Sequence, residues 1–385
     1  MTCPHRVRLA FVLGSFELGG AEMMLWKLLS RLDRSRFDPV VIALSSRADG
    51  MLERFQQSGI ECRLLGVNAS TLFRLATLIS RRSTDIVQGW MYYGNLAATL
   101  SSLMTRSRHA VLWAIRGTLV DAQYTSRSTA LSIWLGGRLS FLPQLIINNS
   151  STSSLQHEAR YGYAASKRVV LPNGFDTDVF RPSAEARSSV RSALGLGPDA
   201  VLAGLIGRYH PMKQHAKFIE AAALVSRRFP DVHYVLAGDR IDGSNAELVQ
   251  AVEQHGLRAR VHLLGRRDDM HVVAAALDLA VSASSSGEGF PNVVGEAMSC
   301  GVPCVVTDVG DSAFVVGDTG LTVPPGDTRA LAGAIEALVG SDARRVELGA
   351  RARQRVVERF SLDAVVRAYE DLYMEVHQRA RAGQA

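Results

Sequence analysis

Two carboxylates flank a turn in the segment GEGFPNVVGEAMSCGVPC, residues 287–304. Glu288 and Glu296 are eight positions apart, with the sequence Gly-Phe-Pro-Asn and two valines between them. An ionised carboxylate accepts charge-assisted hydrogen bonds from hydroxyl groups, so this pair can hold two parts of one polar ligand. Which parts it holds depends on the elements that carry the two side chains.

A strand, a loop and a helix are predicted around this turn. The strand covers 277–282, the polar loop 284–289 and the helix 293–299, which stops at Gly301 with Pro303 just beyond. Backbone N–H groups of residues 290–294 then lack helical partners, which favours an anion there. Since carboxylates repel phosphate, we expect Glu288 and Glu296 to hold hydroxyl groups on either side of it, as in a nucleotide sugar. The alternative is that Glu296 only favours the helix dipole and that Glu288 is solvated.

Two cations occur in the segment GLIGRYHPMKQHAKFIEAAALV. Arg208 and Lys213 are five residues apart, after a predicted buried strand and before an amphipathic helix. Cations at the carboxyl end of a parallel strand are well placed to bind phosphates. The alternative is a pair of solvated side chains on a loop.

A glycine pair, Gly19 and Gly20, stands where the chain enters a predicted helix after the first strand. Backbone N–H groups there can face an anion. The Rossmann fingerprint is absent and Walker A fails, because Ala21 follows where Lys and Ser or Thr are needed. A tight strand-to-helix turn is the simpler interpretation of the pair.

Composition limits the class of protein. The chain has 385 residues, 47% hydrophobic content and a net charge of +6, which suits two packed domains and an anionic ligand or surface. This surplus of positive charge is too small to indicate a nucleic-acid partner. The four cysteines lack zinc or redox spacing, which favours a cytoplasmic location, and no apolar run is long enough to predict a transmembrane helix.

Short apolar runs alternate with helical patterns along the chain. They lie at 9–13, 40–44, 86–88, 111–115 and 145–147, and again at 201–206, 232–237, 261–264, 277–282, 304–307 and 321–323. This alternation is typical of βαβ units, and its restart predicts two α/β domains with parallel sheets. The turn-rich segment 171–189 between them predicts a hinge. Helical spacing after Phe360 predicts a long terminal helix.

The motifs in combination resemble a known family. E-G-F-P-N-x-x-x-E followed by A-M-x-x-G-x-P-C-V is similar to the signature of the retaining GT-B glycosyltransferases of family 4 (GT4). GGAE, LPNGFD, GR with Lys213, LAGD, LLGRRDDM and VPPGD agree in order, over nearly the whole chain. The resemblance implies the GT-B fold, in which two Rossmann-like α/β domains face each other across a cleft and a C-terminal helix crosses back to the first. The implied parts are an acceptor domain at 1–172, a hinge at 173–186, a nucleotide-sugar domain at 187–360 and the crossover helix at 361–385.

The resemblance also implies roles for residues. Arg208 and Lys213 neutralise the donor diphosphate and form the catalytic set with Glu288, which contacts the transferred sugar. Glu296 binds the ribose hydroxyls. Further donor contacts are implied at Gly19 and Gly20 from the first domain and at Gly265 and Arg266 for the base. The backbone of Gly289, Phe290, Pro291 and Asn292 is implied to contact the sugar, and Val293 is a further donor-binding residue.

Two positions depart from the family pattern. Where many relatives carry a histidine near the active site, this chain has Arg116 in AIRGT, and a second such position in GWMYYGN is Tyr93. Arg116 supplies a cation but not a general base. A structural arginine bonded to a strand-end carbonyl is the alternative. Asn173 of LPNGFD is a further candidate beside the hinge.

The implied function is transfer of a sugar, with retention of its anomeric configuration, from a nucleoside diphosphate sugar to a saccharide acceptor. A UDP-sugar donor and a lipid-linked acceptor in bacterial surface polysaccharide or lipopolysaccharide assembly are expected. A nucleotide-sugar epimerase on the same fold and a non-catalytic nucleotide-sugar-binding protein are the alternatives. Neither a cofactor nor a metal is expected, because no Asp-x-Asp stands at the predicted clefts and cations and helix N-termini serve the leaving group.

Apolar and basic residues also occur together in two segments of the first half. One contains Leu72, Phe73, Leu75, Leu78 and Ile79 with Arg74, Arg81 and Arg82, and the other contains Trp134, Leu135, Leu139 and Phe141 with Arg127 and Arg138. This combination suits docking on an anionic bilayer, so a peripheral enzyme on the inner face of the plasma membrane is expected. The alternative is that the apolar residues face the domain core.

Overall fold

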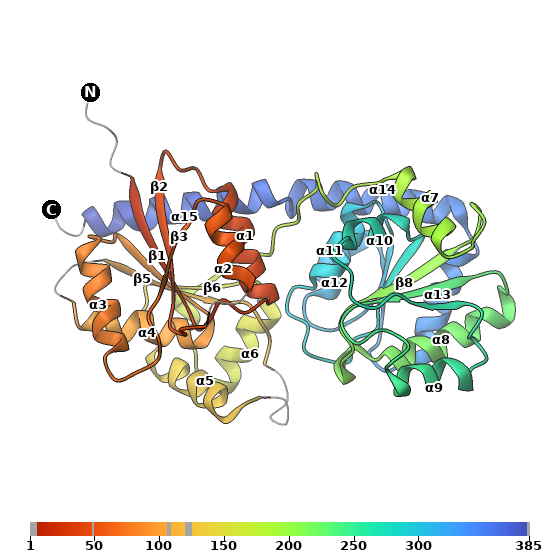
Figure 1. Ribbon diagram of the computed structural model, residues 1–385, viewed down its shortest axis with the longest axis horizontal. Helices are drawn as coiled ribbons and strands as arrows, with labels where there is room; N and C mark the ends of the chain where they lie inside the picture. Colours follow the sequence, from red (N-terminus) through yellow and green to blue (C-terminus); the bar gives the residue numbers. More distant parts are fainter. Residues whose placement is uncertain (1–5, 48–49, 106–108, 120–124, 383–385) are drawn as a thin grey trace. The chain divides into compact units, whose positions relative to one another are not determined.

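The structure, a computed structural model, describes residues 6–47, 50–105, 109–119 and 125–382 (Figure 1). It divides into two compact units, Met1–Gly174 with Leu362–Ala385, and Phe175–Ser361. Apart from its first two residues, the segment 173–186 that the sequence marks as a hinge belongs to the second unit, and its end lies within a helix. Each unit is an α/β body with its own sheet, as the alternating apolar runs predict.

The first unit is built on a parallel sheet with the strand order β3-β2-β1-β4-β5-β6-β7 within the described residues. Its strands are β1 Val7–Leu13, β2 Phe37–Ala43, β3 Glu61–Leu64, β4 Ile86–Trp90, β5 Ala110–Ile115, β6 Leu145–Asn148 and β7 Arg168–Val170. Its helices are α1 Gly20–Arg31, α2 Gly50–Gln57, α3 Thr71–Arg81, α4 Met91–Leu103, α5 Arg127–Leu139, α6 Ser151–Tyr161, the short η2 Ala165–Lys167, and α15 Leu362–Ala382.

Helices cover both faces of this sheet, which explains why its central strands are mostly apolar. On β1, Leu9, Phe11 and Leu13 pack in the core formed with α1, α2 and α15. Ala10 and Val12 point to the other face and pack beneath α3 and α4. The period of two in a strand thus distributes neighbouring residues between two cores.

The terminal helix α15 packs in the first unit, beside α1 (Figure 1). Tyr369 and Tyr373 are fully buried in the core of that unit. The Tyr373 hydroxyl donates to Gln88 Oε1 of β4 at 2.7 Å, and Glu370 accepts from the Asp33 N–H at 2.8 Å. Apolar burial and these hydrogen bonds together hold the helix, and its predicted apolar face packs against the sheet of the first unit.

The second unit, whose residues 175–361 are all described, has a parallel sheet with the order β10-β9-β8-β11-β12-β13. Its strands are β8 Leu202–Ile206, β9 His233–Ala237, β10 Val261–Leu263, β11 Leu279–Ser282, β12 Cys304–Thr307 and β13 Leu321–Val323. Its helices are α7 Ala184–Ala193, η3 Pro211–Lys213, α8 His215–Arg228, α9 Ala246–Gln254, α10 Met270–Ala276, α11 Asn292–Ser299, α12 Ser312–Val316, η4 Gly317–Thr319, α13 Thr328–Val339 and α14 Asp342–Arg359.

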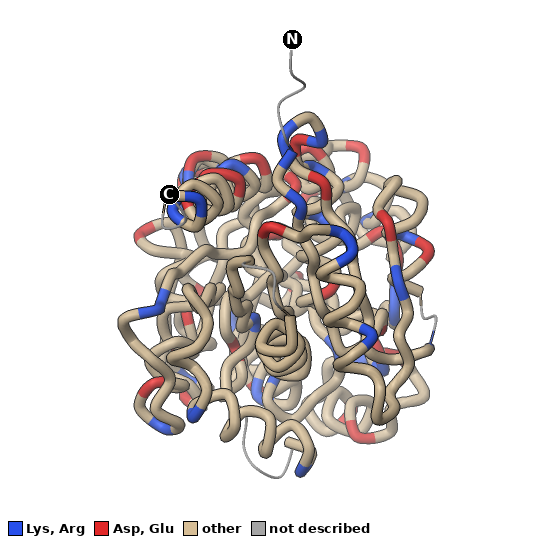
Figure 2. Tube along the Cα trace, turned by 90° about the vertical axis from the view of Figure 1, so that its left-hand side faces the viewer, with Lys and Arg blue, Asp and Glu red and all other residues tan. Residues whose placement is uncertain are grey.

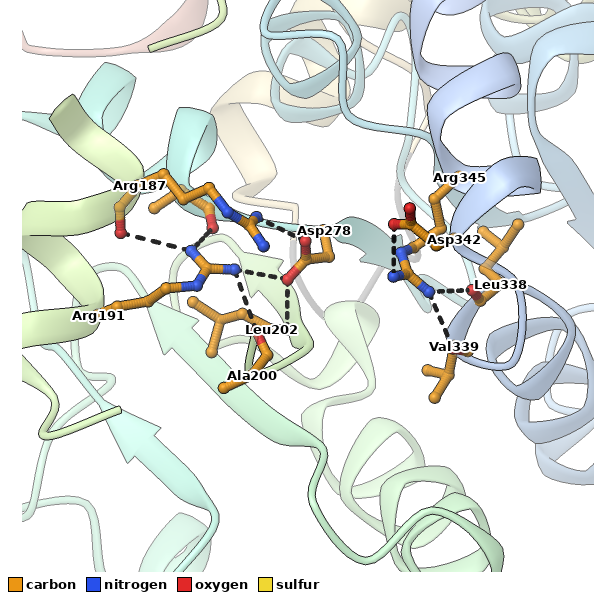
Figure 3. Close-up of polar contacts among 10 residues, drawn as sticks. Arg187, Arg191, Ala200, Leu202, Asp278, Leu338, Val339, Asp342 and Arg345 are labelled. Atoms are coloured by element: carbon orange, nitrogen blue, oxygen red, sulfur yellow. Dashed lines mark hydrogen bonds and ion pairs between the residues drawn. The ribbon is translucent and has the colours of Figure 1, made fainter. Parts of the chain in front are cut away.

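A buried ion-pair cluster fastens α7 to the amino ends of β8 and β11 (Figure 3). Arg187 and Arg191 each reach one carboxylate oxygen of Asp278 at 2.6 Å, and the Leu202 N–H donates to the same carboxylate at 2.7 Å. Arg191 also donates to the carbonyl of Ala276 at 2.7 Å, so its buried charge is both paired and hydrogen-bonded. The cluster lies before both strands begin and is therefore structural.

A third arginine in the same view, Arg345, closes the end of α13 (Figure 3). Arg345 Nη1 donates to the carbonyls of Leu338 and Val339, both at 2.8 Å, and its other nitrogen pairs with Asp342 at 3.0 Å. Carbonyls in the last turn of a helix have no helical donor, so this side chain satisfies them.

Candidate active site

The carboxyl edge of the second sheet carries three neighbouring loops. They follow β8, β11 and β12, which are adjacent in the sheet, and contain residues 207–214, 283–291 and 308–311. Parallel strands all end at the same edge, so side chains that are distant in sequence meet there.

The loop after β8 brings Lys213 back over the sheet edge. The chain passes through the short helix η3, capped by His210, whose Nδ1 accepts from the Met212 N–H at 3.3 Å. Gln214 then adopts a left-handed conformation with φ 54°, after which α8 begins. The Lys213 side chain lies alongside Gly207, where a Cβ atom would be 3.8 Å from Cε.

Lys213 and Glu288, both predicted site residues, form an ion pair. Lys213 Nζ lies 2.5 Å from Glu288 Oε1. The same oxygen accepts a hydrogen bond from Ser284 Oγ at 2.6 Å. Glu288 is 8% exposed, so the solvated alternative for this carboxylate is wrong.

The loop around Glu288 is tightly held on two sides. The Ser285 N–H donates to the Met212 carbonyl at 2.8 Å, and the Asp311 N–H donates to the Gly289 carbonyl at 2.9 Å. Gly310 has φ +61°, and a Cβ atom there would lie 2.0 Å from the Glu288 carbonyl oxygen. Only glycine fits this close approach of two loops.

Helix α11 begins directly after this loop, one residue earlier than the sequence predicts. The Phe290 ring is buried and stacks on Phe175 at 5.9 Å between centroids, so only the backbone of Phe290 is available to a ligand. Gly295 presses on the same Phe175 ring, which leaves no room for a side chain. The helix is therefore anchored through its inner face.

Three predicted donor residues lie on the outer face of α11, whereas Pro291, its N-cap residue, is buried. Val294, Ala297 and Met298 are buried, whereas Asn292, Val293 and Glu296 are partly exposed. Positions 292 and 296 are one helical turn apart and share a face. Glu296 thus lies on the side of α11 that is open to a ligand.

The cations create a positive potential beside the carboxylate. Partial burial, followed by the charges of Arg208 and Lys213, lowers the pKa of His210. Arg208 itself is exposed, and among the described residues no hydrogen bond or ion pair holds its guanidinium group. An anion is therefore favoured where Arg208, His210 and Lys213 converge.

A buried histidine beneath this loop was not recognised from the sequence. His215 opens α8, is almost fully buried, and packs on the Tyr209 ring at 5.3 Å between centroids. Burial lowers its pKa to about 4, so the ring is neutral at physiological pH. Its only sequence signal is a polar residue at the apolar start of a helix.

The residues predicted to bind the base have part of their backbone engaged. The Gly265 N–H donates to the Ile241 carbonyl at 2.7 Å, and the Gly265 carbonyl accepts from the Gly238 N–H at 2.9 Å. Gly265 has φ +67°, which favours glycine. A contact from Gly265 to a base is limited to the second lone pair of its carbonyl, whereas Arg266 is exposed.

The glycine pair in the first unit caps α1. Gly19 is the N-cap residue and Gly20 the first helical residue. A Cβ atom on Gly19 would clash with the carboxylate of Glu22, which folds back over the start of the helix. Burial raises the pKa of Glu22. Any anion at this helix start therefore competes with a carboxylate of the chain itself.

The residues at the family's histidine positions have structural partners. Arg116 is 8% exposed and donates to the Tyr369 hydroxyl at 2.6 Å and to Asn173 Oδ1. Its guanidinium carbon also lies 5.2 Å from the centre of the Trp90 ring. Partners of this kind fit a structural role, although they are side chains rather than the strand-end carbonyl that the sequence suggested.

Tyr93 lies elsewhere in the first unit, at the start of α4, and is partly exposed. Its hydroxyl bonds to Ser128 at 2.8 Å and to Thr129 at 3.1 Å, at the start of α5. Burial raises the pKa of Tyr93, but these hydrogen bonds outweigh burial and lower it.

The two apolar and basic segments differ in burial. On α3, Leu75 and Ile79 lie in the core of the first unit, as the alternative interpretation of this segment predicts. Arg82, just beyond the helix, pairs with Asp38 and Glu61. On α5 the side chains of Leu131 and Trp134 are exposed, as is Phe141 just beyond the helix. On α3 only Phe73 of the named apolar side chains is exposed, whereas the second segment presents several apolar side chains together.

The described residues contain neither a metal-binding cluster nor a membrane-spanning helix. No group of three or more His, Cys, Asp or Glu side chains there is arranged to hold a metal ion. No helix among them has the length and apolar character needed to cross a bilayer.

Two family models match the chain. The model described as Glycosyltransferase Family 4 matches residues 18–179, and the model described as Glycosyl transferases group 1 matches residues 200–341. EpsF of Bacillus subtilis (strain 168), whose name assigns it to the glycosyltransferases, is 32% identical over 310 residues, which are 78% of this chain and 79% of EpsF. The chain belongs to the group 1 glycosyltransferases of family 4 and is a transferase enzyme.

Other relatives match over shorter stretches. The D-inositol 3-phosphate glycosyltransferase of Rhodococcus erythropolis is 33% identical over 57% of this chain and 50% of that protein. The lipopolysaccharide core biosynthesis mannosyltransferase LpsB of Rhizobium meliloti is 31% identical over 55% of this chain and 62% of LpsB. The chain thus spans half to two thirds of the length of these two relatives.

Solved structures confirm the fold. Anabaena HepE in complex with UDP superposes with a TM-score of 0.83 at 24% identity, covering 96% of this chain and all of HepE. A glycosyltransferase from Rickettsia africae gives a TM-score of 0.82 at 18% identity, covering 96% of this chain and 98% of that one. The prediction of a two-domain α/β protein of the GT-B type is therefore confirmed.

Proposed function

We propose that this enzyme transfers a sugar from a nucleoside diphosphate sugar to a saccharide acceptor, with retention of the anomeric configuration. The observation that carries the proposal is the Lys213–Glu288 ion pair at the carboxyl edge of the second sheet. Arg208 and the start of α11 lie on loops of the same edge. Such a site combines a cationic region with a carboxylate, as a sugar diphosphate requires.

The diphosphate is the group that Lys213 and Arg208 bind in this proposal. The Lys213 side chain is long and its ammonium group has three N–H donors, so it can shift from Glu288 toward a phosphate oxygen when the donor binds. Arg208 is exposed and offers a planar fork of donors to phosphate. Both charges act where negative charge grows as the leaving group departs, and this type of stabilisation is usually the largest catalytic contribution.

The two carboxylates bind the ends of the donor. Glu288 faces the transferred sugar and Glu296 the ribose, because each accepts hydrogen bonds from hydroxyl groups and is repelled by phosphate. In the transfer, an acceptor oxygen replaces the diphosphate oxygen on the anomeric carbon. The bond between the anomeric carbon and the diphosphate oxygen breaks, and the proton of the acceptor hydroxyl passes to the departing nucleoside diphosphate.

The donor and acceptor are proposed from the relatives. HepE structures contain UDP and UDP-glucose, so uridine donors are tested first. LpsB acts in lipopolysaccharide core biosynthesis by its name, and another relative from Streptomyces coelicolor is named an exopolysaccharide phosphotransferase. We place this enzyme in bacterial surface polysaccharide assembly, with a lipid-linked saccharide as acceptor.

Attachment to an anionic membrane surface belongs to the same proposal. On α5 and just beyond it, residues 127, 131, 134, 138 and 141 follow helical spacing and combine two arginines with exposed Leu131, Trp134 and Phe141. Arg138 lies over the Trp134 ring at 5.3 Å. On the side shown in Figure 2, basic and acidic positions are interspersed, so attraction to a bilayer depends on this local stripe.

Thermal stabilisation by a panel of UDP-, GDP- and ADP-sugars tests the donor. The true donor is expected to raise the melting temperature by mass action. Transfer is then measured in excess EDTA, since we propose that no metal takes part, and the product anomer is assigned by NMR. A changed sugar formed from the donor alone would indicate an epimerase instead, and no stabilisation by any nucleotide sugar would contradict the proposed function.

A further inference from the structure

A buried hydroxyl group contacts the carboxylate that we assign to the transferred sugar. Ser284 is 1% exposed, and its Oγ donates to Glu288 Oε1 at 2.6 Å. Lys213 Nζ donates to that same oxygen at 2.5 Å. Within the part of the chain that the structure describes, no hydrogen bond reaches Oε2, so the carboxylate has one held oxygen and one that a ligand can use.

Ser284 is fixed by two adjacent strands. It follows β11 by two residues, and its carbonyl accepts a hydrogen bond from Thr307 Oγ1 at 2.6 Å. Thr307 is the last residue of β12 and also bonds to the Ser282 carbonyl at 3.3 Å. The hydroxyl of Ser284 is therefore presented to Glu288 by the sheet itself and is shielded from water.

The two donors on Oε1 differ in what else they must do. Lys213 has a long side chain with 25% of its surface exposed, and the diphosphate of the donor competes for its charge. Ser284 is buried and uncharged, so the diphosphate does not compete for its hydroxyl group. When Lys213 shifts toward the diphosphate, Ser284 is the donor that stays on the carboxylate.

We propose that Ser284 is a positioning residue, which holds Oε1 of Glu288 so that Oε2 faces a hydroxyl of the transferred sugar while Lys213 serves the diphosphate. This assignment rests on the proposed function of Glu288. A charge-assisted hydrogen bond from a buried donor is short and directional, and it fixes the carboxylate plane. Small errors in the position of a catalytic group lower rates by about 100-fold.

The neighbouring serine provides a matched control. Ser285 is exposed, and its hydroxyl makes only a long contact of 3.5 Å with the Met212 carbonyl. The backbone bond of Ser285 to Met212 is kept in an alanine variant. Ser285→Ala is therefore expected to retain the wild-type transfer rate.

The test measures kcat at saturating donor and the Kd of the nucleoside diphosphate for Ser284→Ala, Glu288→Ala and the double variant. Ser284→Ala is expected to lower kcat about 10- to 100-fold and to leave the Kd within about two-fold of wild type. In the double variant the loss is expected to equal that of Glu288→Ala alone, because Ser284 acts only through the carboxylate. If Ser284→Ala does not fold, Ser284→Cys, of similar size but a weaker donor, replaces it under the same criteria.

Three outcomes overturn the assignment of Ser284: a wild-type kcat in Ser284→Ala, a parallel loss of nucleoside diphosphate affinity, or multiplicative losses in the double variant. Multiplicative losses would indicate a role in folding or packing instead. A wild-type rate in Glu288→Ala is a different failure, because it removes the role of Glu288 and with it the proposed function of this site. An inactive Glu288→Ala beside a fully active Ser284→Ala overturns only the role of Ser284.

Discussion

The guanidinium group of Arg116 donates to the hydroxyl of Tyr369 at 2.6 Å, across 253 positions of the chain. Arg116 follows β5, and Tyr369 lies in α15. A further nitrogen of Arg116 reaches Asn173, just before the chain enters the second unit. A single buried cation thus joins the sheet, the connecting segment and the terminal helix of the first unit.

Loss of this link is expected to destabilise the first unit. Arg116→Ala removes the buried donor of both the Tyr369 hydroxyl and Asn173 Oδ1, and Tyr369→Phe removes one of the two acceptors of Arg116, so we expect the free energy of unfolding to fall by about 2–4 kcal/mol for the former and about 1–2 kcal/mol for the latter. Urea denaturation measures both. Exposed Arg127 offers a control whose alanine variant keeps full stability. Normal stability of Arg116→Ala combined with abolished transfer would show that Arg116 acts in the chemistry.

The cationic residues are expected to control turnover. Arg208→Ala and Lys213→Ala each remove a stabiliser of the leaving group, so kcat should fall by about 100- to 1,000-fold. Lys217, which pairs with Glu220 on the surface of α8, is a matched control for Lys213. Steady-state kinetics at saturating donor measures the effect. Rates within a few-fold of wild type in both variants contradict the assignment.

The two carboxylates are expected to separate binding from transfer. Glu296→Ala should weaken the affinity for free nucleoside diphosphate by about 10-fold, because it removes the charge-assisted hydrogen bond that we propose to the ribose. Glu288→Ala should leave that affinity unchanged and lower the transfer rate. Isothermal titration calorimetry with the nucleoside diphosphate distinguishes them. Equal losses of affinity in both variants are incompatible with this division.

The buried His215 predicts a dependence of stability on pH. Its pKa is about 4 in the folded chain, against about 6.5 in the unfolded chain, so the unfolded state binds more protons between these values. Its contribution is complete above about pH 6.5 and is lost as the pH falls toward 4. As the pH falls over this range, the free energy of unfolding of His215→Phe, which keeps a ring against Tyr209, is expected to decrease by about 2–3 kcal/mol less than that of wild type. Denaturation at several pH values measures the difference, and parallel curves would contradict it.

The apolar and basic surface of α5, formed by residues 127, 131, 134, 138 and 141, is expected to bind anionic vesicles. Sedimentation with liposomes should show binding to anionic but not to neutral vesicles, and the binding should disappear at high salt. Trp134→Ser with Phe141→Ser should abolish it, whereas Phe73→Ser on α3 should not. No binding to either kind of vesicle would leave an enzyme that meets its acceptor away from the bilayer.

Local patterns in the sequence were sufficient to predict most strands. A strand that is covered on both faces of a parallel sheet needs apolar residues at successive positions. Such a run is only a few residues long, so it can be recognised from the local sequence. The runs at 201–206 and 304–307 correspond to β8 and β12 within one residue. The strands β3 and β7 were missed because they lie at the edges of the sheet, where half-exposed positions admit polar residues.

Some contacts depend only on the tertiary structure. Lys213 and Glu288 are 75 positions apart and meet because two neighbouring strands end at one edge. The sequence indicated both residues as ligands of one substrate but could not predict that they pair with each other. Ser284 is one of three successive serines, and only its burial and its hydrogen bond to Glu288 distinguish it from Ser285.

The helices α3 and α5 also show that the sequence alone does not predict which surfaces are buried. Both carry apolar and basic residues with helical spacing, and the period alone is identical for a buried and an exposed face. The sequence by itself determined the alternation of strands and helices and the residue types of the site, because these follow from local periodicity and side-chain chemistry. The tertiary structure decided that Leu75 of α3 lies in the core while Trp134 of α5 faces outward, because burial depends on which other elements pack against a helix.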